Sequence, residues 1–278
     1  MLLKPLEYLA RIGLETDPER AVKYDWERPL KPKDVRFVQG LNRKIQGSPQ
    51  FAPARTTAFV GTGWINSQYV PTRRENSRYY NIIAPVSDGI CNDPVYLNQA
   101  LQIYLDEVAK HKGTRVLDIC AGTGIYTAFF AANSPDRQFV AMDVSTGMLG
   151  QLKLKSERLG LQNVSTRRQD FLRMSEKRQF PLIISVGLYG AVSHYDVLKK
   201  ASRVVSPGGS VVLMDEMGID WSKYRGGKPE ELPVGDTQDC AELYDFKLPN
   251  KRQPVDWRII RGYGGERTCV TIKTFQKP

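Results

Sequence analysis

The stretch that decides the fold of this chain is Thr114–Ala131, which reads TRVLDICAGTGIYTAFFA. It begins with a short apolar run, Val116–Ile119, which contains one carboxylate, Asp118, and is typical of a buried strand. A loop of small residues follows at 120–124, and an apolar helical pattern starts at Ile125. The sequence therefore predicts a strand, a tight turn and a helix start. The turn has so little side-chain bulk that a ligand can lie against its backbone.

Outward from this turn, strand-like and helix-like segments alternate along most of the chain. Short apolar runs predict five strands in chain order, at 114–119, 138–143, 163–168, 180–187 and 210–216. Helix-start signals predict helices around them, from Asp93-Pro94, from Ile125, after Ser145 and over about 195–205. Alternation of this kind predicts an α/β fold with a parallel sheet and helices on both faces.

The C-terminal part breaks the alternation. Two β-rich runs, about 256–262 and 268–275, flank a glycine-rich turn and predict a hairpin. The polar residues 217–254 before it predict a long connection with one helix near 237–245. A turn is expected at 206–209, where the chain reads SPGG.

The N-terminal part has weaker patterns. Residues 1–15 predict a short amphipathic helix with Leu2, Leu6 and Leu9 on its apolar face. The stretch 28–37, RPLKPKDVRF, is typical of extended chain because of its prolines and charges. This segment has few apolar runs of its own, so we expect it to pack on the main domain.

Composition restricts the class of protein. The 278 residues are 41% hydrophobic, which is enough for a sizeable core, and no apolar run approaches the roughly 20 residues of a membrane span. Charged residues interrupt the first 15 positions, so no signal peptide is expected. Four cysteines without a CxxC pair and two histidines argue against a metal site. A reduced, cytoplasmic setting is the expectation.

The net charge of +10 is concentrated near the start of the chain. Residues 1–80 contain 14 Lys and Arg against 8 Asp and Glu, whereas residues 81–278 contain 26 against 22. Within 64–80, four aromatic residues are interspersed with arginines. This pattern suits a lid over a planar or anionic ligand, a single-stranded nucleic-acid site, or a surface helix with tyrosines packed beneath it. A solvated basic surface is the alternative reading of the charge.

Carboxylates stand at the predicted strand ends. Asp118 ends the first strand, Asp143 ends the second and Asp170 follows the third. Because ligands of open parallel sheets bind at the carboxyl ends of the strands, Asp143 is placed to accept hydrogen bonds from a ribose and Asp170 from an adenine amino group. The third glycine of a dinucleotide fingerprint and the lysine of a Walker loop are both absent, so phosphate cradles are not favoured.

Taken together, the motifs resemble those of class I S-adenosylmethionine-dependent methyltransferases over residues 78–275. The matching segments are RYYNIIAPVSD, VLDICAGTG, FVAMDVSTGML, RRQDFLRM, RVVSPGGSVVLMDE and the terminal hairpin. The chain departs from the family's GxGxG loop at its first glycine, where Cys120 stands. The resemblance implies a Rossmann-like, seven-stranded, mostly parallel sheet with a C-terminal antiparallel hairpin. It also implies an N-terminal lid segment at 1–90 before a cofactor-binding domain at 91–278.

The resemblance also implies S-adenosyl-L-methionine as cofactor and S-adenosyl-L-homocysteine as product. It assigns Asp118 to the methionine end, Asp143 to the ribose and Asp170 to the adenine amine. The cofactor-binding residues that it implies are Tyr80, Asp118, Cys120, Ala121, Gly122, Thr123, Gly124, Asp143, Val144, Met148, Asp170, Phe171, Val186 and Gly187.

A sulfonium methyl group is already activated, so the protein mainly has to align an acceptor with it. We expect a small-molecule or natural-product acceptor that is methylated at oxygen or nitrogen. His194 and Tyr189 follow the fourth strand, where substrate-side groups often lie, and His194 is either a general base or a helix cap. An RNA or protein methyltransferase that uses the basic N-terminal segment is one alternative. A protein that binds the cofactor for another reaction is a second.

Overall fold

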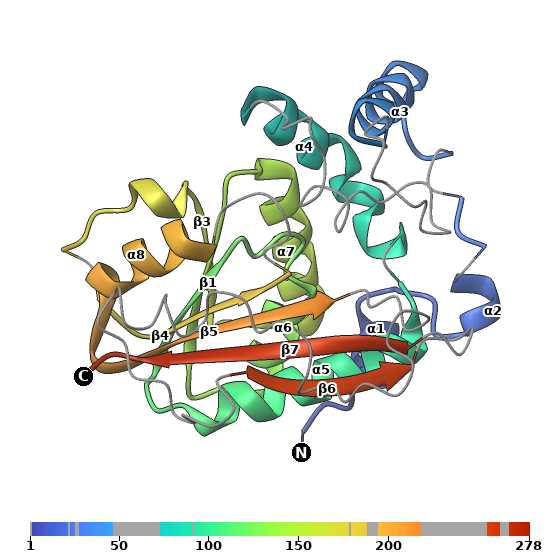
Figure 1. The fold of residues 1–278 in the computed structure, drawn as a ribbon. Coiled ribbons are helices and arrows are strands. Elements are labelled where there is room, and N and C mark those ends of the chain that lie inside the picture. The colour runs from blue at the N-terminus through green and yellow to red at the C-terminus, as the bar shows by residue number, and fades with distance from the viewer. Residues whose placement is uncertain are drawn as a thin grey trace, which may run out of the picture.

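A seven-stranded sheet runs through the centre of the molecule (Figure 1). The computed structural model describes residues 2–21, 23–25, 28–46, 73–90, 92–177, 179–187, 194–217, 255–261 and 267–278. The strands are β1 Arg115–Ile119, β2 Gln138–Asp143, β3 Val164–Arg168, β4 Phe180–Val186, β5 Val205–Met217, β6 Val255–Arg261 and β7 Arg267–Gln276. Their order across the sheet is β3-β2-β1-β4-β5-β7-β6.

Strands β1 to β5 pair in parallel, whereas β7 is antiparallel to both β5 and β6. This confirms the α/β class, the parallel sheet and the antiparallel C-terminal pair. Strand β5 begins earlier than expected, because the predicted turn at 206–209 is part of it. The pairing of β4 with β5 shifts register between Phe180 and Leu182, and this irregularity takes up the glycines.

Helices cover both faces of the sheet. The helices are α1 Pro5–Arg11, α2 Pro18–Ala21, α3 Pro32–Gln46, α4 Arg73–Ile90, α5 Pro94–Lys110, α6 Ile125–Asn133, α7 Thr146–Leu159, the short 3-10 helix η2 Phe171–Arg173 and α8 His194–Val204. Adjacent residues of a strand point to opposite faces of the sheet. Val116 accordingly packs in the apolar cluster on the face covered by α1, α5 and α6, and Leu117 packs in the apolar cluster on the face covered by η2 and α8. None of the described helices has the length and apolar character needed to cross a membrane.

Helix α5 begins where the sequence predicts. The carboxylate of Asp93 accepts the backbone N–H groups of Val95 and Tyr96, at 2.9 and 3.1 Å, and Pro94 occupies the first helical position. At its other end, Glu107 is 6% exposed and accepts hydrogen bonds from Lys110 at 2.6 Å and from Thr274 of β7 at 3.3 Å. The Nε2 atom of His111 lies 3.2 Å from the same carboxylate. Glu107 therefore joins the helix to the sheet.

The Glu107 contacts predict a loss of stability in acid. The hydrogen bond to His111, with the bond and charge of Lys110, lowers the pKa of Glu107 from 4.5 to about 2, although burial acts in the opposite direction. The ionised Glu107 therefore contributes to the free energy of unfolding in full above pH 4.5. This contribution is lost as pH falls toward 2, because Glu107 of the unfolded chain takes up its proton at a higher pH than in the folded protein. We expect Glu107→Gln to remove about 2 kcal/mol of this pH dependence in urea unfolding, whereas the exposed neighbour variant Asp106→Asn keeps it.

Two expectations for the N-terminal part are wrong. Helix α1 lies within the predicted 1–15 and buries Leu9 as expected, together with Tyr8, but the predicted face is wrong for Leu2 and Leu6, which are 67% and 43% exposed. The stretch 28–37 is not extended throughout, because α3 begins at Pro32. Proline is favourable in the first turn of a helix, and its fixed φ starts α3 here.

Helices α3, α4 and the start of α7 share a third apolar cluster, separate from the two sheet faces. Its buried members include Val38 of α3, Tyr79 and Ile83 of α4 and Met148 of α7. Figure 1 shows α4 and α3 side by side at one end of the molecule, beyond α7. The expected helix near 237–245, Trp64, Tyr69 and Tyr189 lie outside the described residues.

Candidate functional site

The strand order reverses at β1, and the candidate site lies at this point. Strand β1 has β2 on one side and β4 on the other, with Ile119 level with Met142 and Asp118 level with Ile184. In open parallel sheets, ligands bind beyond the carboxyl ends of the strands at such a point, so the residues that follow β1 and β2 are the first candidates.

The loop after β1 has an unusual backbone. Cys120, Gly122 and Gly124 have φ angles of 55°, 55° and 71°, so three of its five residues are left-handed. The Ala121 N–H donates to the Met142 carbonyl at 3.1 Å, and the Gly124 N–H donates to Ala121 at 2.9 Å. Among the described residues, Cys120 is the non-glycine residue in this region of φ, at the position where the family motif has glycine. The loop therefore has a left-handed residue with a side chain, and its backbone is strained at Cys120.

The two glycines are needed for different reasons. A Cβ atom on Gly124 would lie 2.4 Å from Leu152 Cδ1, so this glycine permits close packing of the loop against α7. A Cβ atom on Gly122 would have no described atom within 4 Å, so the backbone at Gly122 faces open space. Helix α6 starts directly after Gly124, which offers no side-chain cap to its first N–H groups. An anionic group fits beside this positive helix end.

Asp118 is a buried carboxylate below the loop. It is 2% exposed, and the Thr127 hydroxyl of α6 donates to its Oδ2 atom. Burial raises the pKa of Asp118 from 3.8 to about 7, the Thr127 hydrogen bond opposes this shift, and the charge of Asp143 adds to it. An anion at this position is unfavourable in the empty protein, so a cationic ligand group beside it would be stabilised.

Asp143 holds the loop from the end of β2. Its Oδ2 atom accepts the Gly122 N–H at 2.9 Å, and its Oδ1 atom accepts the Ser145 N–H at 2.8 Å. Burial raises the pKa of Asp143, and these backbone hydrogen bonds counteract the shift. A carboxylate oxygen can accept two hydrogen bonds, so each oxygen retains capacity for a ligand hydroxyl. Asp143 is a helix-entry residue and a candidate ligand group at the same time.

The residues predicted for the adenine end are divided between the surface and the core. Val144 is 38% exposed, whereas Phe171 is buried with η2 and α8 and Met148 is buried against α3 and α4. Asp170 caps η2 by accepting the Leu172 N–H at 3.1 Å, and it lies 3.8 Å from Arg173. Val144 and Asp170 are thus the members of this group with some exposure to solvent.

The remaining predicted residues lie on other elements. Gly187, with φ of 72°, ends β4 and donates its N–H to the Met214 carbonyl at 2.8 Å, next to the half-buried Val186. Tyr80 of α4 is half-buried beside the α3–α4 cluster, and its ring centroid lies 5.3 Å from that of Tyr79. His194 is the first residue of α8, and its side chain lies outside the described part of the structure, as does all of Tyr189.

Comparisons with known proteins agree with this geometry. Residues 116–209 match a family model described as a methyltransferase domain. This part of the chain is similar to a methyltransferase domain. Similar curated proteins are the demethylmenaquinone methyltransferases of Bacillus cytotoxicus, 33% identical over 106 residues (37% of this chain and 45% of that protein), and of Bacillus mycoides, 33% identical over 118 residues (41% and 50%). The chain spans about half the length of these relatives.

The fold is also found among solved structures. The crystal structure of the [4+2]-cyclase SpnF superposes with a TM-score of 0.55 at 16% sequence identity, and the match covers 75% of this chain and 97% of that one. At this identity the likeness concerns the fold alone. A methyltransferase-like fold hosts more than one reaction, so the chemistry must be argued from the site.

The residues of this methyltransferase domain fit S-adenosylmethionine as its cofactor. The open space beside Gly122 admits a ligand next to the loop, and the uncapped start of α6 suits a carboxylate. Asp118 supplies a buried negative charge, and Asp143 has acceptor capacity for hydroxyl groups. These features lie on consecutive elements, β1, the loop, α6 and the end of β2.

Alanine at the two loop glycines should separate stability from binding. Gly124→Ala forces a Cβ atom into Leu152 at a positive φ, and we expect about 2–3 kcal/mol of lost stability. Gly122→Ala should cost only about 1 kcal/mol, since its Cβ meets no described atom, yet it should abolish S-adenosylhomocysteine binding. Urea unfolding and calorimetric titration measure the two effects. Equal losses of stability in both variants would contradict the assignment of Gly122 to the ligand side.

Sequence reasoning missed four polar residues around the site. Asn81 and Asp88 of α4 and Lys155 of α7 bind the loop and the start of α7, and Thr127 binds Asp118. Thr127 could have been found, because it follows the loop by one helical turn. The others are separated from their partners by 32 to 67 positions, so spacing along the chain holds no signal of them.

Proposed function

We propose that the protein transfers the methyl group of S-adenosylmethionine to an oxygen or nitrogen atom of a small-molecule acceptor. The observation that carries the proposal is the hydrogen bond from the Gly122 N–H to Asp143, which joins the glycine loop to the acid at the end of β2 inside the matched domain. The names of the Bacillus relatives support a small-molecule acceptor. Their matches cover about half of each relative, so they do not decide the acceptor.

In this proposal the residues of the chain bind and orient the cofactor. Asp118 would pair with its ammonium group, Asp143 would accept from the ribose hydroxyls, and Asp170 would accept from the adenine amino group. Val144 would flank the adenine, with Phe171 and Met148 supporting that end from the core. Val186 and Gly187 would line the methionine end with backbone, and Tyr80 would close the site from α4.

The bound cofactor supplies an activated methyl group on a sulfonium. The contribution of the protein is then alignment, and exclusion of water from the acceptor. The acceptor would give up a proton if it is a hydroxyl or a protonated amine, and the methyl donor would be left as neutral S-adenosylhomocysteine. His194 is our candidate to receive that proton, since it opens α8 shortly after β4. Tyr189 lies in the connection between them.

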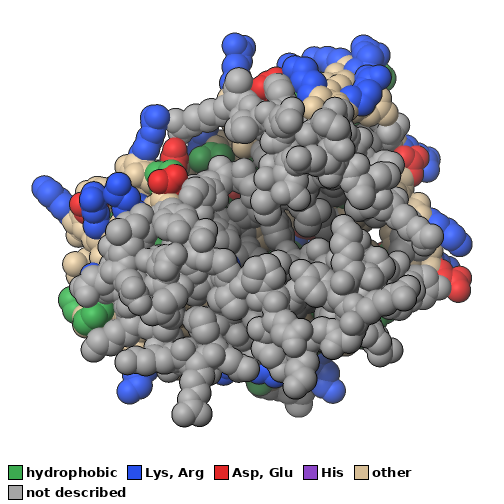
Figure 2. All heavy atoms as spheres, in the orientation of Figure 1, with side chains coloured by type: hydrophobic (Ala, Val, Ile, Leu, Met, Phe, Trp, Pro, Cys, Tyr) green, Lys and Arg blue, Asp and Glu red, His purple; other side chains and the backbone are tan. Residues whose placement is uncertain are grey.

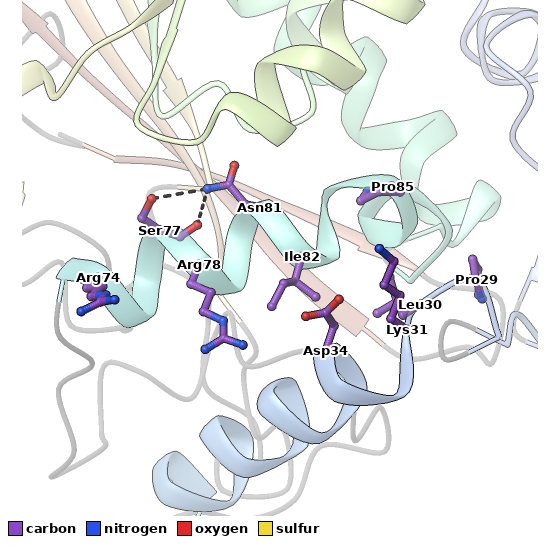
Figure 3. A pocket seen from close by; sticks show the side chains of 10 residues that line it. All are labelled: Pro29, Leu30, Lys31, Asp34, Arg74, Ser77, Arg78, Asn81, Ile82 and Pro85. Carbon is purple, nitrogen blue, oxygen red and sulfur yellow. Dashed lines mark hydrogen bonds between the residues drawn. The ribbon is translucent and has the colours of Figure 1, made fainter.

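We further propose that the N-terminal segment, residues 1–90, selects the acceptor as a lid before the cofactor domain at 91–278. A groove of about 860 Å³ lies between α3 and α4, away from the glycine loop, and each described residue that lines it comes from positions 29–85 (Figure 3). Lys31, Arg74 and Arg78 project into it with one acid, Asp34. Lys and Arg side chains also gather over α3 in the space-filling view (Figure 2). The charge suits an acidic or polar acceptor.

The groove is connected to the cofactor end of the sheet through Asn81. This residue lines the groove, and its Oδ1 atom accepts from Ser145 and Gly147 of the α7 start. We expect the double variant Arg74→Ala/Arg78→Ala to raise the acceptor KM by about tenfold, from the loss of two partly exposed cations, without changing the affinity for S-adenosylhomocysteine. Lys112→Ala, far along the chain on the α5 side, is the matched charge control. A lowered kcat with an unchanged KM would remove the groove from acceptor binding.

The test of the function has two stages. Calorimetric titration with S-adenosylhomocysteine should show saturable binding, which Asp143→Ala removes. Incubation with methyl-labelled cofactor and a panel of acceptors (demethylmenaquinone, phenols, amines, RNA and a protein extract) should then transfer label to a small molecule. Binding without transfer to any acceptor would favour a different reaction on the same cofactor. Transfer to RNA, with an affinity that falls steeply with salt, would favour the nucleic-acid alternative.

A further inference from the structure

A buried polar cluster joins α4 to the glycine loop. The Lys155 ammonium of α7 pairs with Asp88 of α4 and donates to the Thr123 carbonyl at 3.1 Å. The Thr123 hydroxyl donates to the other oxygen of Asp88. The side chains of Lys155 and Asp88 are only 5% and 15% exposed. Three elements that are distant in the sequence therefore meet at one residue of the loop.

The burial of this cluster makes each member depend on the others. A lysine ammonium removed from water is unfavourable unless a carboxylate and further acceptors replace the lost hydration. Asp88 and the Thr123 carbonyl are the acceptors that Lys155 has here. If α4 moved away, Lys155 would lose its counter-ion. The position of α4 and the position of Thr123 are thus linked by charge and by hydrogen bonding.

The cluster acts on the part of the loop that faces the ligand. Thr123 stands between Gly122 and Gly124, both with positive φ, and its neighbour Gly122 is fixed on the other side by Asp143. The loop is therefore held from two directions, by Asp143 of β2 and by Asp88 with Lys155. Removal of either support frees φ angles that the loop keeps only through its contacts.

A second contact holds α4 two helical turns away on the same side. Asn81 Oδ1 accepts the Gly147 N–H at 2.8 Å and the Ser145 hydroxyl at 3.0 Å, at the start of α7 directly after Asp143. Residues 81 and 88 are seven positions apart, so they lie on one face of α4. Figure 1 shows α4 next to α7, in agreement with these bonds. Helix α4 is attached at both ends of the proposed cofactor site.

We propose that Asp88 and Lys155 are positioning residues for the methyl donor, which couple the docking of α4 to the shape of the glycine loop. The proposal rests on the function proposed above. Coupling between two events is reciprocal, so a loop that depends on α4 for its shape makes cofactor binding tighten the docking of α4.

The first experiment measures affinity. Lys155→Met should weaken S-adenosylhomocysteine binding by about tenfold or more, and Asp88→Asn should do the same, with less than additive loss in the double variant. The matched control is Lys44→Met, which removes another lysine paired with α4, through Glu75 at 3.3 Å on the surface. It should bind within about twofold of the wild type. Additive losses at Asp88 and Lys155 would overturn the coupling.

The second experiment uses the wild-type protein, so it can test the proposal even if Lys155→Met does not fold. Hydrogen exchange of the wild-type protein is followed with and without S-adenosylhomocysteine. With S-adenosylhomocysteine bound, we expect slower exchange in α4 as well as in the glycine loop. The proposal makes no demand on the exchange of α5. Protection of the loop with unchanged exchange in α4 would overturn the proposal while leaving the cofactor function intact. No binding at all would instead reject the function and, with it, the positioning role.

Discussion

Asp143→Ala should reduce the affinity for S-adenosylhomocysteine by about 100-fold or more, because it removes charged hydrogen bonds on both sides of the carboxylate. In the protein, Asp143 accepts the N–H groups of Gly122 and Ser145. In the proposed complex it also accepts from the ribose. The variant leaves two backbone donors without their acceptor and loosens the loop at the place where the ligand lies. Calorimetric titration measures the loss directly.

Asp143→Asn sharpens this test. An amide has an acceptor at its oxygen only, so its NH2 group would face the N–H of either Gly122 or Ser145. We therefore expect it to bind nearly as poorly as the alanine variant, despite its similar size. Asp136→Ala removes an exposed carboxylate from the turn before β2 and should bind as the wild type does. Full binding by Asp143→Asn would show that the negative charge and both acceptors are dispensable, and would assign the ribose elsewhere.

The pH dependence of cofactor binding should be bell-shaped because of Asp118. Its pKa is raised to about 7 by burial, so the carboxylate of the free protein takes up a proton as pH falls below 7. A ligand ammonium needs the ionised form, so the affinity should fall by about tenfold between pH 8 and pH 6. At still higher pH the ligand's own α-amino group loses its charge, and the affinity should fall again. Titrations across this range measure both the fall in affinity at low pH (the acid limb) and the fall at high pH.

Asp118→Asn should abolish the acid limb. The amide cannot ionise, yet its oxygen can still accept from the Thr127 hydroxyl, so the local packing is kept. We expect weaker binding at pH 7.5, by about tenfold, and no further fall toward pH 6. The control is Asp170→Asn, which removes a carboxylate at the adenine end and should keep the acid limb. If the limb persists in Asp118→Asn, another group titrates and the ammonium partner has been misassigned.

The sheet and the positions of the candidate acids on its strands could be predicted because their signals are local. A run such as Val116–Ile119 followed by small residues determines a strand and its turn within ten positions, and the hairpin formed by β6 and β7 has the same property. The acids Asp118 and Asp143 could be placed because parallel strands end at one edge of a sheet. Each of these inferences needs only the residues beside it.

The N-terminal part could not be predicted well, for the converse reason. In α3, prolines and charges conceal a helix whose apolar residues Val38 and Leu41 are buried in a cluster with α4 and Met148. In α1, the buried face is chosen by contacts such as that of Tyr8 with Ile125, whose carbonyl accepts the tyrosine hydroxyl. The pair of Asp88 with Lys155 likewise joins positions 67 apart. Such choices are made by tertiary packing, which a periodic pattern does not contain.

The path of the chain before α5 suggests how such proteins diversify. Helix α1 is fixed to the sheet side of the molecule, where the N–H and carbonyl of Leu3 bond with the Asn133 amide. The two ends of the segment 16–91 are tied together, because the Asn92 amide donates to the Glu15 carbonyl at 2.6 Å. Doubling the length of a segment with joined ends costs only about 0.6 kcal/mol of stability. Evolution can therefore replace this segment by one of another length, provided that the new segment keeps partners for Ser145 and Lys155.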